Sequence, residues 1–200
     1  GLGDVYKRQT YTTWSAMVPL KRALAETPMI VASFSADETS WYLDATQRPD
    51  SRFTTFFHET FIPTVESAYA GDGRRAITGF SMGGFGALHL ALAAPDRFTS
   101  ISALSGAFTP TASERTSGDL VALLGERADH EADYAAIDLE TRLRTRFAQL
   151  PPLYFHCGSE DRLVTSQRHL GTVLRDLGLG EDRLVLSETP GGHDWAFWRD

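Results

Sequence analysis

The feature that most constrains this chain is a Gly-x-Ser-x-Gly pattern at residues 79–83, where an apolar stretch gives way to a helical one. Residues 75–80 are typical of a short buried strand, and residues 86–94 of a helix that ends before Pro95. On such a strand–turn–helix, Ser81 occupies a tight, strained turn that projects its hydroxyl above the sheet. The pattern predicts a nucleophilic serine, with a purely structural turn as the alternative.

The rest of the chain alternates between strand-like and helix-like segments, which predicts an α/β fold with a mainly parallel sheet flanked by helices. The predicted strands are residues 29–34, 75–80, 98–105, 152–158 and 183–187. The predicted helices are residues 17–25, 51–69, 86–94 and 163–177. Residues 107–149 are polar and partly helical, and we interpret them as a lid-like insertion over the carboxyl edge of the sheet. We expect residues 10–200 to form a single domain.

The first nine residues, 1–9, match the translation of a transposon adapter used to prepare sequencing libraries. Because chance does not account for such a match, we treat this segment as non-native and exclude it from the fold. We therefore expect a domain truncated at its N-terminus, without its first strands and without any export signal. The C-terminus also follows closely after His193.

Composition and motifs narrow the classes of partner. The net charge of −7 argues against nucleic acid or an anionic membrane surface. No apolar run approaches the roughly 18 residues that span a bilayer. The single cysteine, Cys157, excludes an internal disulfide and is typical of a buried structural thiol. The sequence contains no zinc-type ligand spacing, phosphate loop or dinucleotide fingerprint, so no metal is expected. Compartment and oligomeric state are left open.

Two later loops carry the predicted partners of Ser81. A serine hydroxyl needs an adjacent base, and a third group must orient that base. Asp161 follows the strand that ends at residue 158, and His193 follows the last predicted strand. Since the carboxyl ends of parallel strands meet at one edge of the sheet, we predict Asp161 as the acid and His193 as the base. Glu160 is an alternative acid, and the alternative bases are His58, His89, His130, His156 and His169.

Stabilising the oxyanion of a tetrahedral intermediate requires preorganised N–H donors. The backbone amide of Met82, directly after the serine, is predicted to supply one donor. The second donor is expected from a loop in or before the adapter-like segment and is not assigned. Trp41 and Tyr42 stand on an early loop, where they either line the substrate pocket or pack that loop onto the sheet.

From Thr12 onward the chain resembles the esterase family that includes S-formylglutathione hydrolases of the esterase D type, antigen 85 mycolyltransferases, feruloyl esterases and tributyrin esterases. The most specific segments are residues 40–44, 79–88, 158–161 and 192–198. The resemblance implies an α/β-hydrolase fold, a triad of Ser81, Asp161 and His193, no cofactor, and small-molecule esters with modest acyl groups as substrates. The family's His-Gly loop, which normally precedes the Thr-Trp segment, is missing here.

A serine carboxylesterase is therefore the leading hypothesis. A thioesterase of the S-formylglutathione hydrolase type is the first alternative, disfavoured because those enzymes usually carry His where Phe85 stands. An acyltransferase of the antigen 85 type is the second alternative. An inactive fragment or binding module is the third.

Overall fold

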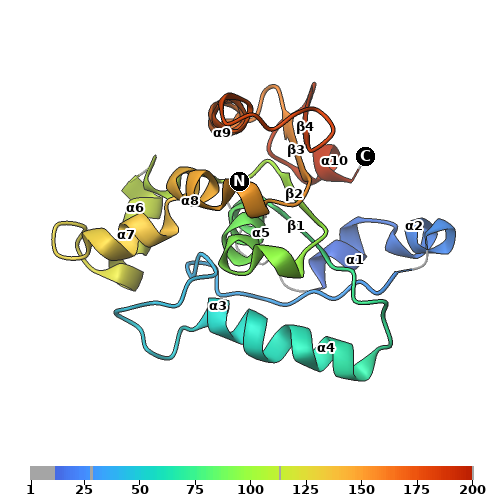
Figure 1. Cartoon of the computed structure of the whole chain (residues 1–200), viewed down its shortest axis with the longest axis horizontal. Helices are drawn as coiled ribbons and strands as arrows, with labels where there is room; N and C mark the ends of the chain where they lie inside the picture. Colours follow the sequence, from blue (N-terminus) through green and yellow to red (C-terminus); the bar gives the residue numbers. More distant parts are fainter. Residues whose placement is uncertain (1–11, 28, 113, 200) are drawn as a thin grey trace.

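Four short apolar segments form one parallel sheet whose strand order follows the sequence. In the computed structural model, which describes residues 12–27, 29–112 and 114–199, these strands are β1 (Ala76–Phe80), β2 (Ser100–Leu104), β3 (Leu153–Gly158) and β4 (Leu184–Thr189). Figure 1 shows them at the centre of the molecule, with helices around them. Four of the five predicted strands are thus confirmed, together with the parallel α/β architecture.

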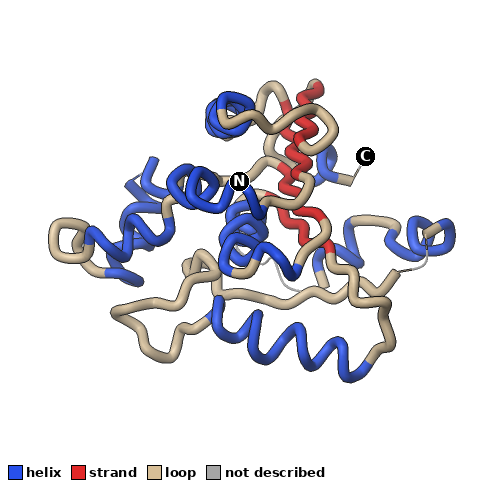
Figure 2. Tube along the Cα trace, viewed as in Figure 1, coloured by secondary structure: helices blue, strands red, loops and turns tan. Residues whose placement is uncertain are grey.

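Helices α5 (Met82–Ala93) and α9 (Val164–Asp176) make the crossovers that parallel strands require. Helix α5 connects β1 to β2 and is apolar on all sides, so residues 84–92 are all buried. Helix α9 connects β3 to β4 and buries one face only, with Leu170, Val173 and Leu174 on it. Buried side chains of both helices belong to the same hydrophobic core as Ile101 and Phe155 of the sheet. Figure 2 shows the two helices beside the strands.

Residues 107–149, predicted to be a lid-like insertion, form three α-helices between β2 and β3. They are α6 (Glu114–Leu124), α7 (Glu131–Ile137) and α8 (Leu139–Arg146), with short 3₁₀ turns at Pro110–Ala112 and Phe147–Gln149. Leu120, Leu123 and Leu143 are fully buried, and α8 lies against α5 and α9. These contacts anchor the segment to the core, while its role as a lid stays a prediction.

The N-terminal helices differ from the predicted pattern. The predicted helix over residues 17–25 is instead two helices, α1 (Thr13–Met17) and α2 (Leu20–Glu26), because Val18 is extended before Pro19. The predicted helix over residues 51–69 is confirmed as a continuous run of α3 (Phe53–Phe56), a π-helical turn (Phe57–Phe61) and α4 (Ile62–Ala68). The last helix is α10 (Trp195–Trp198). The adapter-like residues 1–9 lie outside the described residues.

The strand predicted over residues 29–34 is wrong. This segment joins no sheet, and Met29, Ile30 and Val31 are about half exposed, at 58%, 47% and 48%. A strand needs a neighbour for its backbone N–H and C=O groups. Within the described residues, β1 is paired only with β2, and residues of β1 and residues 29–36 line the same cleft. The apolar pattern is suited to a strand, but among the described residues this segment pairs with no strand.

The part of the chain that the structure describes contains no helix that is both long and apolar enough to cross a membrane.

We predict that adding a side chain at two different glycines changes the free energy of unfolding in opposite directions. A Cβ at Gly79 would overlap the carbonyl oxygen of Gly83, whereas a Cβ at Gly118 in α6 meets no atom within 4 Å. We expect Gly79→Ala to lower the free energy of unfolding by about 1–3 kcal/mol, because β1 and α5 must separate. We expect Gly118→Ala to raise it by about 0.5–1 kcal/mol, because alanine favours the helix. Urea denaturation measures both, and equal stability of the two variants would contradict this close approach.

Candidate active site

The turn between β1 and α5 holds Ser81 in a backbone conformation that few residues adopt. Its φ is +55° and its ψ −122°, and it directly precedes the first residue of α5. The Ser81 amide donates to the carbonyl of Leu104 at 2.9 Å, and its own carbonyl accepts from the Gly84 amide at 3.0 Å. Both bonds hold the turn between the sheet and the helix. The strained conformation expected from the sequence is therefore present at Ser81.

Three side chains from separate loops form one hydrogen-bonded series. Nε2 of His193 lies 2.9 Å from Oγ of Ser81, and Nδ1 of His193 lies 2.7 Å from Oδ2 of Asp161. With Nδ1 protonated, His193 donates to the carboxylate and accepts the serine proton at Nε2. The side chains of His193 and Asp161 are 7% and 0% exposed, so water competes little for these bonds. The structure thus brings together the three residues that the sequence singled out.

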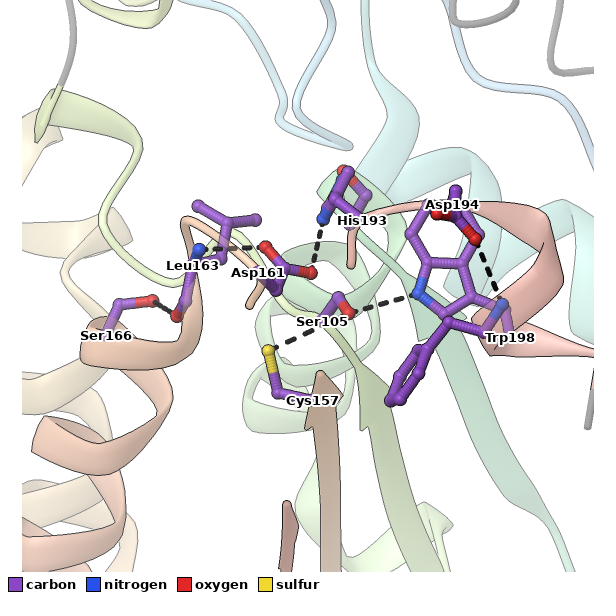
Figure 3. A network of polar contacts seen from close by, with 10 residues as sticks. Ser105, Cys157, Asp161, Leu163, Ser166, His193, Asp194 and Trp198 are labelled. Carbon is purple, nitrogen blue, oxygen red and sulfur yellow. Dashed lines mark hydrogen bonds and ion pairs between the residues drawn. The ribbon is translucent and has the colours of Figure 1, made fainter. Parts of the chain in front are cut away.

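The Asp161 carboxylate is held ionised in spite of its burial. Burial alone would raise its pKa above the ordinary 3.8, but hydrogen bonds from His193, the Leu163 amide and Ser105 outweigh this effect and lower the pKa. The Leu163 amide donates to Oδ1 at 2.8 Å, which leaves Oδ2 for His193. Figure 3 shows these two oxygens facing different partners. An ionised acceptor in a buried site fixes the tautomer and the ring orientation of His193.

The alternative acid and bases have other partners. Glu160 is exposed on the same loop, and its amide donates to the Gly191 carbonyl. The other histidines bind elsewhere, namely His58 to Leu90, His89 to Thr54, His130 to Asp133, His156 to Thr189 and His169 to Glu140. Over the described ranges, no three His, Cys, Asp or Glu side chains gather as a metal site requires.

A cleft of about 2490 Å³ opens beside Ser81 and is lined by Trp41, Tyr42 and Met82 among others. It is larger than an ordinary ligand pocket of about 300–1,000 Å³ because it continues along the edge of β1 to residues 29–36. Only the part of the cleft near Ser81 lies within reach of the serine hydroxyl.

Trp41 and Tyr42 both line the cleft and both pack on α5. Trp41 is 3% exposed and meets Phe85 edge-on at 5.3 Å. The Tyr42 ring rests on Gly86, where a Cβ would overlap it, and burial raises the pKa of its hydroxyl to about 12. Tyr42 thus stays protonated and can donate a hydrogen bond. Contact of either residue with a substrate stays a prediction.

Met82 is the first residue of α5, at the end of the helix where amide N–H groups lack intrahelical partners. The position expected for one oxyanion donor therefore lies next to Ser81, at the positive end of the helix dipole. The second donor was expected from a segment outside the described residues.

Sequence reasoning missed Ser105, a fully buried residue that follows β2 and contacts the site. Trp198 donates its indole N–H to Oγ of Ser105 at 3.0 Å. The only signal was its position after a strand, which Ser105 shares with the three predicted residues.

Comparisons with known proteins identify the family of this chain. A family model described as "Putative esterase" matches residues 8–200. An acetyl esterase from Caldicellulosiruptor saccharolyticus is 33% identical over 181 residues, covering 80% of this chain and 64% of the relative. This chain thus spans somewhat less than two thirds of that relative.

Solved structures resemble the fold closely. The serine hydrolase FphF of Staphylococcus aureus superimposes with a TM-score of 0.80 at 22% identity, covering 96% of this chain and 75% of FphF. MPT51 of Mycobacterium tuberculosis gives a TM-score of 0.75 at 18% identity, covering 93% of this chain and 78% of MPT51. At such identities the likeness establishes the fold alone, which is that of the α/β-hydrolases.

The lowered pKa of Asp161 predicts an acid-dependent loss of stability. Because its folded-state pKa lies below 3.8, the carboxylate stabilises the fold above about pH 4, and this contribution disappears as pH falls through the folded-state pKa. Thermal unfolding between about pH 6 and pH 2 should therefore show the stability difference between parent and Asp161→Asn narrowing as pH falls.

The matched control for this experiment is Asp176→Asn, which removes an exposed carboxylate. Its unfolding curve should stay parallel to that of the parent across the same range. A difference for Asp161→Asn that stays constant with pH would contradict the ionised, hydrogen-bonded state.

Proposed function

The chain belongs to the esterase family whose model it matches over residues 8–200, and from this membership we propose that it is a serine carboxylesterase for small esters with short acyl groups. The observation that carries the proposal is the series Ser81–His193–Asp161, with bonds of 2.9 Å and 2.7 Å. A serine hydroxyl is a weak nucleophile by itself, and a base held in place by a carboxylate activates it.

In the first step, Oγ of Ser81 attacks the ester carbonyl while Nε2 of His193 takes the hydroxyl proton. The imidazolium that forms faces the buried carboxylate of Asp161, which stabilises its charge and holds its ring in place. The carbonyl oxygen becomes an oxyanion, and the amide of Met82 at the start of α5 donates to it.

In the second step, the tetrahedral intermediate collapses to an acyl-serine, and His193 gives its proton to the leaving alcohol. Water then enters the cleft beside Ser81 and loses a proton to Nε2 as its oxygen attacks the acyl carbon. Breakdown of this second intermediate releases the carboxylic acid and returns the proton to Ser81. The deep burial of His193 and Asp161 strengthens each of these charge-dependent contacts.

Two observations favour a short acyl group. The relative that is 33% identical is named an acetyl esterase. In this chain, the Tyr42 ring rests on Gly86, and its hydroxyl lies beside Gly83, within the elbow itself. These aromatic atoms take up volume close to Ser81, which favours compact acyl groups there.

The serine mechanism predicts a large loss of turnover when the Oγ atom of Ser81 is removed. Ser81→Ala should lower kcat for p-nitrophenyl acetate by about 10⁴- to 10⁶-fold, because removing the nucleophile of a triad costs about as much as removing all three members. Ser51→Ala is the matched control, since Ser51 is also buried but lies outside the series. Spectrophotometric assays and labelling by a fluorophosphonate measure both effects. Equal turnover by parent and Ser81→Ala, or a parent that neither turns over nor takes the label, would overturn the proposal.

Substrate panels separate the esterase from its alternatives. An esterase should hydrolyse p-nitrophenyl acetate in preference to S-formylglutathione, and adding a sugar acceptor should not divert its acyl group from water. Preferred thioester cleavage would favour the thioesterase, whose members usually carry His where the buried Phe85 stands. Acyl transfer to the sugar would favour the acyltransferase.

A further inference from the structure

Ser105 occupies an unusual backbone position at the centre of the site. It is 0% exposed and follows the last residue of β2, with a φ of +48°. Its amide donates to the carbonyl of His156 at 2.7 Å. A residue with a side chain rarely adopts a positive φ unless its surroundings impose it, and such residues cluster at functional sites.

The hydroxyl oxygen of Ser105 already accepts a hydrogen bond. The indole N–H of Trp198 can only donate, so Oγ of Ser105 accepts this bond at 3.0 Å. The thiol of Cys157 also points at this oxygen, with Sγ at 3.8 Å. The hydroxyl proton of Ser105 is therefore left for another acceptor, and the strongest one beside it is the Asp161 carboxylate.

Donation from this hydroxyl, like donation from His193 and the Leu163 amide, lowers the pKa of the Asp161 carboxyl against the effect of burial, which raises it. Figure 3 shows Ser105 between Asp161 and Trp198, with the indole nitrogen directed at its hydroxyl. Trp198 also meets the His193 ring edge-on at 4.9 Å, and its amide donates to Asp194 at 3.2 Å. The ring of Trp198 thus contacts His193, and its indole N–H binds Ser105, which lies beside Asp161.

We propose that Ser105, anchored by Trp198, is a positioning residue that holds the Asp161 carboxylate in line with His193. The Leu163 amide and His193 each bind one carboxylate oxygen, and a further donor on a fixed backbone limits rotation of the group. Ser105 is fully buried and does not line the cleft beside Ser81, so in this proposal it acts only through Asp161. The inference rests on the proposed serine hydrolase function.

Two variants test the hydroxyl separately from the backbone. Ser105→Ala and Ser105→Gly both remove the donor, but only glycine relieves the positive φ. We expect both to lower kcat for p-nitrophenyl acetate by about 10- to 100-fold, the cost of a lost hydrogen bond to a charged group, with KM little changed. Ser105→Gly should nevertheless melt at a higher temperature than Ser105→Ala.

The pH–rate profile supplies a readout that a merely structural role would not move. With fewer donors, the Asp161 carboxylate protonates at a higher pH and leaves more negative charge facing His193 while it is ionised. Both effects shift the acid limb of kcat/KM towards higher pH in the two variants. Ser51→Ala removes a buried hydroxyl that has no hydrogen-bond partner among the described residues, so it should keep the parent's rate and profile.

Three results would overturn the inference. The first is a rate within about twofold of the parent in both variants, too small for a charged hydrogen bond. The second is a lower rate with an unmoved acid limb, and the third is a normal rate in Ser105→Gly alone, which would assign the effect to backbone strain. Fluorophosphonate labelling of the parent at Ser81 separates these results from failure of the proposed function, in which the parent itself stays unlabelled.

Discussion

Backbone hydrogen bonds that continue the parallel ladder beyond the strands hold the candidate site together. The amide of Ser81 binds Leu104, that of Ser105 binds His156, and that of Ser159 binds Thr189, at 2.7–2.9 Å. Each bond joins the residue after one strand to a residue in the last half of the next strand, so the four loops share the register of the sheet. Since a slip of one residue turns every side chain to the opposite face, the same register fixes which groups meet.

The candidate site also requires close packing of backbone against backbone. A side chain at Gly158 would overlap the carbonyl of Gly191. Gly158 ends β3 directly before the loop of Asp161, and Gly191 lies in the loop that carries His193. The loops approach closely enough for a 2.7 Å bond because this position has no Cβ. The polar chemistry of the site therefore depends on residues that carry no functional group themselves.

Much of this arrangement could be predicted, because strands and their following loops leave local patterns. The elbow at Ser81 and the loops of Asp161 and His193 all carry glycines at recognisable spacings beside apolar runs. Ser105 could not be recognised, since its importance comes from Trp198, 93 residues away along the chain. Residues 29–34 have the composition of a strand, but pairing depends on a neighbour that a local pattern does not contain. Local signals thus predict elements and loops, while partners across the sheet require the fold.

Within the described residues, one edge of β1 has no strand beside it, because β1 pairs only with β2. Residues of β1 line a cleft together with Met29, Ile30 and Val31, whose apolar side chains are exposed. An open strand edge beside apolar surface is a template on which another polypeptide can add a strand. Among the described residues, this edge of β1 is thus the place where a further strand can be added, on the same strand whose last residue precedes the nucleophile.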